Sequence, residues 1–239
     1  MIDLHCHLLP GIDDGSRSLE ESLAMARLAV ADGITAVRAT PHIHIGRYAN
    51  DRASIEAAAE ALRGELAREG ISLELTAAAE VRLDYELVAM IEADRIPYLG
   101  ALDGEPVLLL EFPHSHVPVG AEHFVAWLRR RGIRPMIAHP ERNRGIMEDP
   151  GRLSAFVDAG CLLQLTADAV AGGFGAKAER AAREMLEREW VTVLASDAHD
   201  TKERPPRLSA GRAAASRIVG DEAARRLTED MPRRLLSGS

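Results

Sequence analysis

Short apolar runs alternate with helical patterns along almost the whole chain, and this alternation limits the folds that the sequence can adopt. Strands that are separated by helices run parallel, with right-handed crossovers between them. Closing such a sheet gives an α/β barrel, and 239 residues suit one barrel of this kind. The sequence therefore predicts a single α/β domain over residues 1–239. The expected strands are residues 1–7, 34–39, 72–79, 107–110, 133–138, 161–166 and 191–196.

Capping residues and glycines mark the ends of the intervening helices. Ser18 and Glu21 have the spacing of a capping box, and Gly33 and Gly70 follow the first two helical patterns. The expected helices are residues 18–33, 51–69, 85–92, 120–131, 150–159 and 176–189, with two more after residue 208.

Charge and apolar content exclude several classes of protein. The net charge is −8, whereas a surface that binds nucleic acid is basic. No apolar run approaches the ~20 residues of a membrane helix, and the first residues lack the basic and apolar regions of a signal peptide. We therefore expect a cytoplasmic protein without membrane insertion. Cys6 and Cys161 lie far apart in sequence and suggest neither a disulfide framework nor a Cys-x-x-Cys zinc site.

Two histidines, His5 and His7, stand one residue apart at the end of the first expected strand. Alternate side chains of a strand share a face, so both imidazoles should point the same way while Cys6 points away from them. Such a pair can bind a metal ion. By itself the pattern is weak, because a His-x-His pair is more often at the surface or beside a site than a pair of ligands.

Ligand-type side chains stand at the C-terminal ends of six expected strands. In α/β barrels this is the end at which functional sites are built. Buried carboxylates that follow apolar strands need a cation to offset their desolvation. Each residue also has a structural explanation: a hydrogen-bonded core histidine, a glutamate paired with arginine, or an aspartate capping a helix. The six are His5, His42, Glu80, Glu111, His139 and Asp197.

With His7, Asp14 and His199 the candidate ligands number nine, which is more than one ion accepts. Two or three divalent ions that share bridging carboxylates are therefore expected. Imidazole and carboxylate ligands without thiolate suit manganese, iron or zinc, and we favour manganese.

Several motifs in this order resemble the PHP (polymerase and histidinol phosphatase) superfamily of metal-dependent phosphoesterases. The resemblance covers nearly the whole chain. Within the superfamily it is greatest to bacterial protein-tyrosine phosphatases that are encoded with capsular or exopolysaccharide genes. The motifs are Asp3-Leu4-His5-Cys6-His7, Asp13-Asp14-Gly15, Ala138-His139-Pro140-Glu141-Arg142, Ala195-Ser196-Asp197-Ala198-His199 and Arg204-Pro205-Pro206.

The resemblance implies a distorted seven-stranded TIM-like barrel, three ions and a phosphate site. Arg142 and Arg204 would hold the phosphate and, with His199, would be the catalytic residues. The implied ion sets are His5, His7, Glu80 and Asp197 for the first ion, Glu80, Glu111 and His139 for the second, and Asp14, His42 and His199 for the third.

The implied reaction is hydrolysis of phosphotyrosine on a protein, such as a tyrosine kinase that regulates capsule or exopolysaccharide synthesis. Clustered dications lower the pKa of a bridging water, and the resulting hydroxide would attack phosphorus. Cys6 is not expected to be a nucleophile, because the glycine-rich phosphate loop of cysteine phosphatases does not follow it. Self-association into a homo-oligomer stays open.

Two alternatives remain at the level of sequence. A small-molecule phosphatase of the same superfamily, such as histidinol-phosphate phosphatase, would use the same metal ligands. A non-catalytic PHP-type binding domain is a second alternative, although the complete ligand set argues against it. The loop histidines His44, His114 and His116 have no assigned role.

Overall fold

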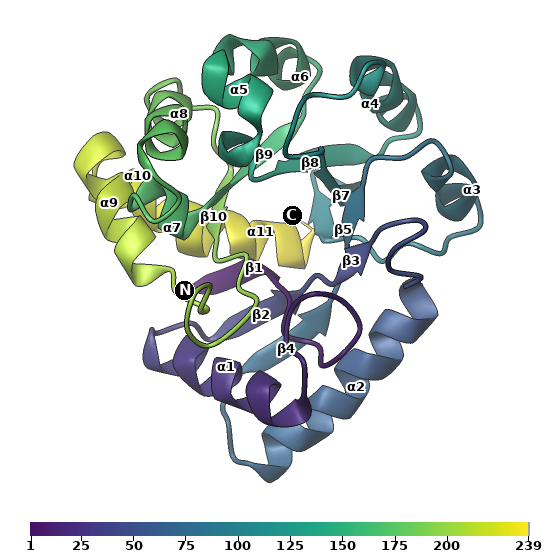
Figure 1. Ribbon diagram of the computed structural model, residues 1–239, viewed down its shortest axis with the longest axis vertical. Helices are drawn as coiled ribbons and strands as arrows, with labels where there is room; N and C mark the ends of the chain where they lie inside the picture. The colour runs from purple at the N-terminus through teal and green to yellow at the C-terminus, as the bar shows by residue number, and fades with distance from the viewer. Residues whose placement is uncertain (239) are drawn as a thin grey trace.

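The computed structural model describes residues 1–238, which form a mixed α/β structure with parallel strands and helices packed outside them (Figure 1). The strands are β1 (Ile2–Cys6), β2 (Ala36–Ala39), β3 (His42–Ile43), β4 (Glu74–Ala77), β5 (Glu80–Arg82), β6 (Gly100–Leu102), β7 (Glu105–Glu111), β8 (Arg134–Ala138), β9 (Leu162–Thr166) and β10 (Val193–Ala195).

The helices follow the strands in the expected order. The α-helices are α1 (Leu19–Ala31), α2 (Arg52–Arg68), α3 (Leu87–Glu92), α4 (Ala121–Arg130), α5 (Arg144–Glu148), α6 (Ser154–Asp158), α7 (Ala167–Val170), α8 (Ala176–Glu187), α9 (Ser209–Val219), α10 (Asp221–Arg225) and α11 (Met231–Ser237). Two 3₁₀-helices, η1 (Pro140–Arg142) and η2 (Pro150–Leu153), and one π-helix, η3 (Arg226–Asp230), complete the elements.

The strands form two sheets. The first has the order β1-β2-β4, and the second has the order β10-β9-β8-β7-β5-β3, with β6 antiparallel to β7. All other strand pairs are parallel, as the alternation of strands and helices predicts. This strand pairing confirms parallel α/β structure but does not confirm a closed barrel.

The chain passes from one sheet to the other at two places. Thr40 and Pro41 separate β2 from β3, and Ala78 and Ala79 separate β4 from β5. His42 and Glu80 consequently begin short strands of the second sheet, whereas the sequence placed them directly after strands. The two sheets also meet where their edge strands β1 and β10 end. There the backbone N–H of Asp197 donates to His5 O, and the backbone N–H of His7 donates to Ala198 O, both at 2.8 Å.

Two apolar clusters lie on the two faces of the strands. Leu4 from the first sheet, Leu109 from the second and Leu235 from α11 belong to one cluster. Leu108 and Leu110 belong to the other, which packs against the outer helices. Strand β7 is thus buried on both faces, which explains its uninterrupted apolar sequence. Helix α11 crosses behind the strands in Figure 1 and covers the end of the fold away from the viewer.

Element boundaries differ from the sequence predictions in several places. The expected helix at 150–159 is divided into η2 and α6, and the two helices expected after residue 208 are α9 and a longer run of α10, η3 and α11. The antiparallel strand β6 was not expected. None of the helices in the part of the chain that the structure describes is long and apolar enough to cross a membrane.

Candidate metal centre

Nine imidazole and carboxylate side chains gather at the ends of β1, β7, β8 and β10, at the starts of β3 and β5, and in the loop after β1. Eight of them form three overlapping groups, and within each group the potential ligand atoms lie within 4.8 Å of one another. The ninth, His139, contacts Glu80. The groups are His5, His7, Glu80 and Asp197; His7, Asp14, His42 and His199; and His42, Glu80 and Glu111.

The first group is completely enclosed. His5 Nε2 lies 3.4 Å from Glu80 Oε2 and 3.2 Å from Asp197 Oδ1. His7 Nε2 lies 3.4 Å and 3.3 Å from the same two oxygens. Neither Glu80 Oε2 nor Asp197 Oδ1 accepts a hydrogen bond within the described residues. Two imidazole nitrogens and two buried, unsatisfied carboxylate oxygens therefore surround one point, as the ligands of a divalent cation do.

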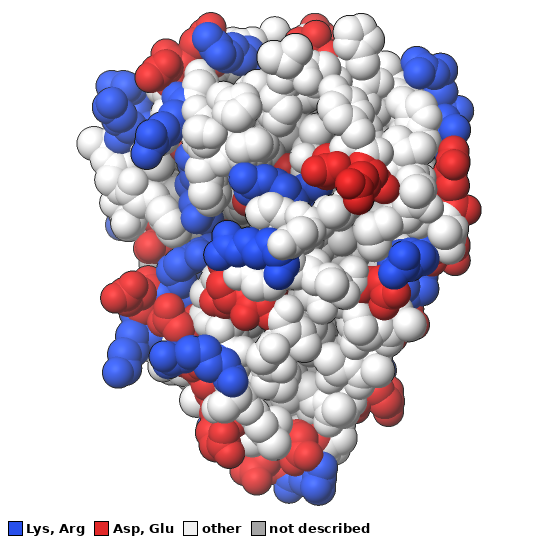
Figure 2. Space-filling model, turned by 45° about the vertical axis from the view of Figure 1, so that its right-hand side comes forward, with Lys and Arg blue, Asp and Glu red and all other residues white. Residues whose placement is uncertain are grey.

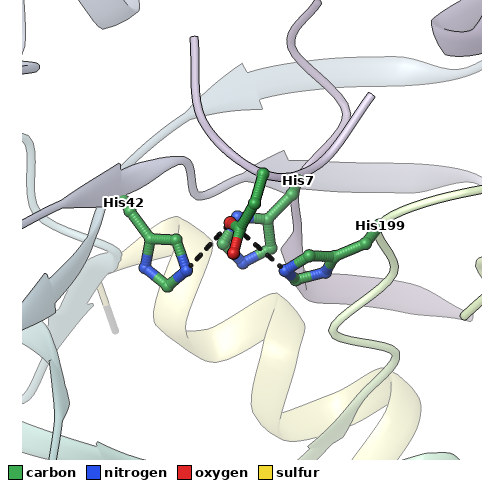
Figure 3. A group of neighbouring side chains, drawn as sticks. His7, His42 and His199 are labelled. Carbon is green, nitrogen blue, oxygen red and sulfur yellow. Dashed lines mark ion pairs between the residues drawn. The ribbon is translucent and has the colours of Figure 1, made fainter. Parts of the chain in front are cut away.

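The second group opens towards solvent, because the side chain of Asp14 is 41% exposed. Asp14 Oδ1 lies 3.3 Å from His42 Nε2 and 3.7 Å from His199 Nε2. Figure 3 shows His42 and His199 approaching this carboxylate from opposite sides, with His7 close by. The rings of His7 and His199 are 3.9 Å apart between centroids. Of the three groups, this one contains the most exposed side chain.

Glu80 connects the first group to the third. Its Oε2 lies 3.0 Å from His42 Nδ1, and its Oε1 lies 2.7 Å from His139 Nε2. Glu111 Oε2 is 4.0 Å from His42 Nδ1. The sequence grouped Glu80 and Glu111 with His139, whereas in the structure Glu111 groups with Glu80 and His42. Glu80 therefore belongs to both the first and the third group.

Two residues that the sequence analysis did not single out orient the paired histidines. Asp13 Oδ2 lies 2.7 Å from His7 Nδ1 and also accepts a hydrogen bond from the backbone N–H of His42. Gln164 Oε1 lies 2.8 Å from His5 Nδ1. In both cases the acceptor favours the tautomer in which Nδ1 carries the proton and Nε2 is free to bind a cation. Asp13 adjoins Asp14 in the sequence, but Gln164 gave no signal of its own.

Backbone geometry at two ligands is unusual. His139 (φ 32°) and Asp197 (φ 52°) have left-handed backbone conformations that non-glycine residues seldom adopt. Asp3 holds the segment before Asp197 in place, because its carboxylate accepts hydrogen bonds from the N–H and hydroxyl of Ser196. Burial raises the pKa of Asp3 to about 6. Both residues with this backbone conformation are thus candidate ligands at the ends of strands.

Electrostatics keep the central carboxylates ionised. Burial alone would raise the pKa of Glu80 and of Asp197, but neighbouring imidazoles hold both well below their usual values. Burial would lower the pKa of His42, yet the facing Glu80 raises it to about 10. Burial and the nearby His7 lower the pKa of His199 to about 3. The neighbouring carboxylates also raise the pKa of His5 and of His7, so a cation that binds here would take the place of imidazole protons.

Arginines approach the centre from two sides. Arg142 and Arg204 both pair with Asp197 Oδ2, and Arg204 Nη2 also donates to the carbonyl oxygen of Asp197 at 2.9 Å. Arg82 Nη1 lies 2.8 Å from Glu111 Oε1. Figure 2 shows basic side chains gathered across the middle of one face, with acidic side chains directly beside them. The ligand carboxylates thus adjoin guanidinium groups that can bind an anion.

The remaining loop residues lie around the opening. The ring of Tyr48 stacks on His42, with centroids 5.6 Å apart and an interplanar angle of 6°. The ring of His114 lies 5.4 Å from that of His139. Cys6 is buried in the outer apolar cluster and away from the two histidines, as the alternation predicted. An open cavity of about 420 Å³ adjoins Asp14 and His199.

Comparison with known families gives a match along the chain. The family described as capsular polysaccharide synthesis, CpsB/CapC, matches residues 1–237. Among curated relatives, the tyrosine-protein phosphatase YwqE of Bacillus subtilis is 40% identical over 204 residues, which are 85% of this chain and 79% of the relative. The tyrosine-protein phosphatase CpsB of Streptococcus pneumoniae is 28% identical over 246 residues, or 99% of this chain and 98% of the relative.

Comparison with solved structures also gives a match to tyrosine phosphatases. One crystal structure superposes with a TM-score of 0.93 at 35% sequence identity, covering 100% of this chain and 95% of the other. It comes from work on YwqE of Bacillus subtilis and CpsB of Streptococcus pneumoniae, described as unique metal-dependent tyrosine phosphatases.

Proposed function

The chain belongs to the CpsB/CapC family of capsular polysaccharide synthesis proteins, and from this membership we propose that it is a metal-dependent protein-tyrosine phosphatase. The observation that carries the proposal is the first group of ligands. Glu80 and Asp197 present buried, unpaired oxygens to the two imidazoles of His5 and His7, and a bound cation satisfies all four.

The proposed cofactors are two or three divalent transition-metal ions, manganese first, with iron or zinc as alternatives, because imidazole and carboxylate ligands without thiolate suit all three metals. Their ligands would be the eight residues of the three groups together with His139. When bound, such ions neutralise phosphate charge and lower the pKa of a coordinated water. The proposed ligands are His5, His7, Asp14, His42, Glu80, Glu111, His139, Asp197 and His199.

The residues of the chain itself have separate proposed roles. Arg142 and Arg204 hold the phosphate, since both guanidinium groups pair with Asp197 Oδ2, on the side of the carboxylate away from His5 and His7, and retain N–H donors that the carboxylate does not use. Asp13 and Gln164 keep His7 and His5 in the tautomers that leave Nε2 free. A phenolate leaves readily, so the reaction does not require a strong general acid.

We further propose a single domain in which the two sheets are the halves of a distorted seven-stranded PHP-type barrel. Support comes from the hydrogen bonds between residues 5–7 and residues 197–198 and from the apolar cluster shared by both sheets. The breaks after β2 and β4 would be the distortion. They also carry His42 and Glu80 from one half to the other.

The proposed substrate is phosphotyrosine on a cytoplasmic protein, such as a tyrosine kinase of capsule or exopolysaccharide synthesis. Its support is the family's described role and the open side of the second ligand group, where Asp14 is 41% exposed. An opening of this kind admits a side chain that projects from a peptide.

The proposal is tested by phosphate release from a phosphotyrosine peptide and from histidinol phosphate, each with manganese and with a chelator. We expect faster release from the peptide and loss of activity with the chelator. Greater kcat/KM for histidinol phosphate would instead identify a small-molecule phosphatase. No release from either substrate by metal-loaded protein would favour a binding domain.

A further inference from the structure

A partly exposed phenylalanine, Phe174, lies on a tight turn between α7 and α8. Gly172 (φ 93°) and Gly175 (φ 84°) flank it with backbone angles that favour glycine. At Gly173, an added Cβ would lie 2.0 Å from an oxygen of the exposed Asp168 carboxylate, so the Asp168 side chain would have to move. Hydrogen bonds from Gly173 N to Asp168 O (2.8 Å) and from Gly175 N to Gly172 O (3.0 Å) fix the turn. The positive φ angles of Gly172 and Gly175 and these two hydrogen bonds thus define the turn that carries the aromatic ring.

The ring stands beside both arginines that are proposed to hold phosphate. The guanidinium carbon of Arg142 lies 4.5 Å from the centroid of the Phe174 ring. Phe174 also lines a cavity of about 190 Å³ together with Arg142 and His114, and a second of about 160 Å³ together with Arg204. Phe174 therefore contacts Arg142 directly and shares a cavity with Arg204.

Resting on the proposed function, we infer that Phe174 is an aromatic wall that contacts the phenyl ring of the substrate and gives the enzyme its preference for aryl phosphates. In an aryl phosphate the ring begins at the ester oxygen, whereas in phosphoserine only a methylene group occupies that position. A phosphate held by Arg142 and Arg204 brings a directly attached ring next to Phe174, within the ~4.5–7 Å at which aromatic pairs interact.

The chemistry of the turn supports contact with substrate more than a purely structural role. Burying an aromatic ring against the apolar core would need no glycine turn, but Phe174 is partly exposed and packs on a cation. Guanidinium stacking fixes the orientation of the ring and leaves the rest of its surface to a ligand. The wall adds an apolar contact to a site whose other groups are charged.

The test measures binding to manganese-loaded protein by calorimetry, with phenylphosphonate and methylphosphonate as probes that are not hydrolysed. The variants are Phe174→Ala, Phe174→Leu and Phe174→Tyr, with metal content and melting temperature checked for each. We expect Phe174→Ala and Phe174→Leu to weaken phenylphosphonate binding by about two- to tenfold. Binding of methylphosphonate should stay the same, and Phe174→Tyr should retain both affinities.

Three results would overturn the inference. Equal weakening of both probes would mean that Phe174 only positions Arg142. Full phenylphosphonate affinity in Phe174→Leu would mean that the aromatic ring contributes nothing. Wild-type protein that binds the two probes equally, or binds neither, would show that there is no aromatic wall.

Phosphotyrosine turnover by the same wild-type preparation separates this inference from the proposed function. Selective binding of phenylphosphonate without turnover would reject the phosphatase proposal but would still support contact between Phe174 and the phenyl ring. Turnover without selective binding would reject the role of Phe174 and keep the phosphatase proposal.

Discussion

Asp197 contacts both the candidate metal-binding histidines and the arginines that are proposed to bind phosphate. Its Oδ1 faces His5 and His7, its Oδ2 pairs with Arg142 and Arg204, and its backbone N–H donates to His5 O. One carboxylate thus connects the proposed metal ligands to the proposed phosphate-binding groups. Substitution of Asp197 should therefore affect both metal binding and phosphate binding.

Substituting Asp197→Asn preserves the shape of the side chain and removes its charge. We expect loss of bound metal and a fall in kcat/KM of more than the about 100-fold that changes to supporting residues cause. Metal analysis after desalting and phosphate-release assays would measure the two effects. Asp158→Asn, at an exposed position on α6, is the matched control and should alter neither. Retention of full metal content and activity in Asp197→Asn would refute the proposed site.

Arg204→Ala should separate phosphate binding from metal binding. Charge-assisted hydrogen bonds contribute about 1.5–3 kcal/mol, so the inhibition constant for inorganic phosphate should rise at least about tenfold while metal content stays unchanged. The control is Arg217→Ala, since Arg217 is exposed on α9. A variant that loses metal but binds phosphate as the wild type does would contradict this assignment.

At the scale of elements, the order of strands and helices was predictable because burial on both faces gives apolar runs such as Leu108–Leu110. The six strand-end ligands followed from that order. The sheet change at Pro41 was not predictable, because an extended segment keeps the same side-chain alternation whichever partner it pairs with. Gln164 was missed for a related reason: only the folded structure brings it, from β9, to His5.

The loop after β1 provides a test of element packing. At Gly15 an added Cβ would lie 2.3 Å from both the Cβ and the carbonyl oxygen of His7, so the loop cannot keep its place if Gly15 is replaced. We expect Gly15→Ala to lower the free energy of unfolding by about 1–3 kcal/mol and to weaken metal binding, because Asp13 and Asp14 move with the loop. Chemical denaturation and metal titration measure these changes.

Gly64→Ala is the control for that substitution. Gly64 lies in α2 with no atom within 4 Å of an added Cβ, so alanine should stabilise the helix by about 1 kcal/mol and leave metal binding unchanged. If Gly15→Ala behaved in the same way, the close approach of the loop to His7 would have no energetic consequence.

At the scale of the whole molecule, the candidate centre joins the two sheets. His5 belongs to the three-stranded sheet, whereas Glu80 and Glu111 belong to the seven-stranded one. A cation held between them stabilises only the folded state, since the unfolded chain does not bring these ligands together.

Metal should therefore raise the melting temperature. At 100 times its dissociation constant one ion adds about 2.7 kcal/mol, and for a chain of this size each kcal/mol shifts the midpoint by about 2–4 °C. We expect a rise of at least about 5 °C between chelated and manganese-loaded protein in scanning calorimetry, and a smaller rise for Asp197→Asn. Identical midpoints with and without metal would contradict a centre that bridges the sheets.

The most direct measurement of the central claim follows phosphate release from a phosphotyrosine peptide while metal-free protein is titrated with manganese, with bound metal counted in the same samples. The account predicts no release without bound metal, and a rate that rises with occupancy and saturates when the ligand groups are filled. Full activity in protein that contains no bound metal would contradict it.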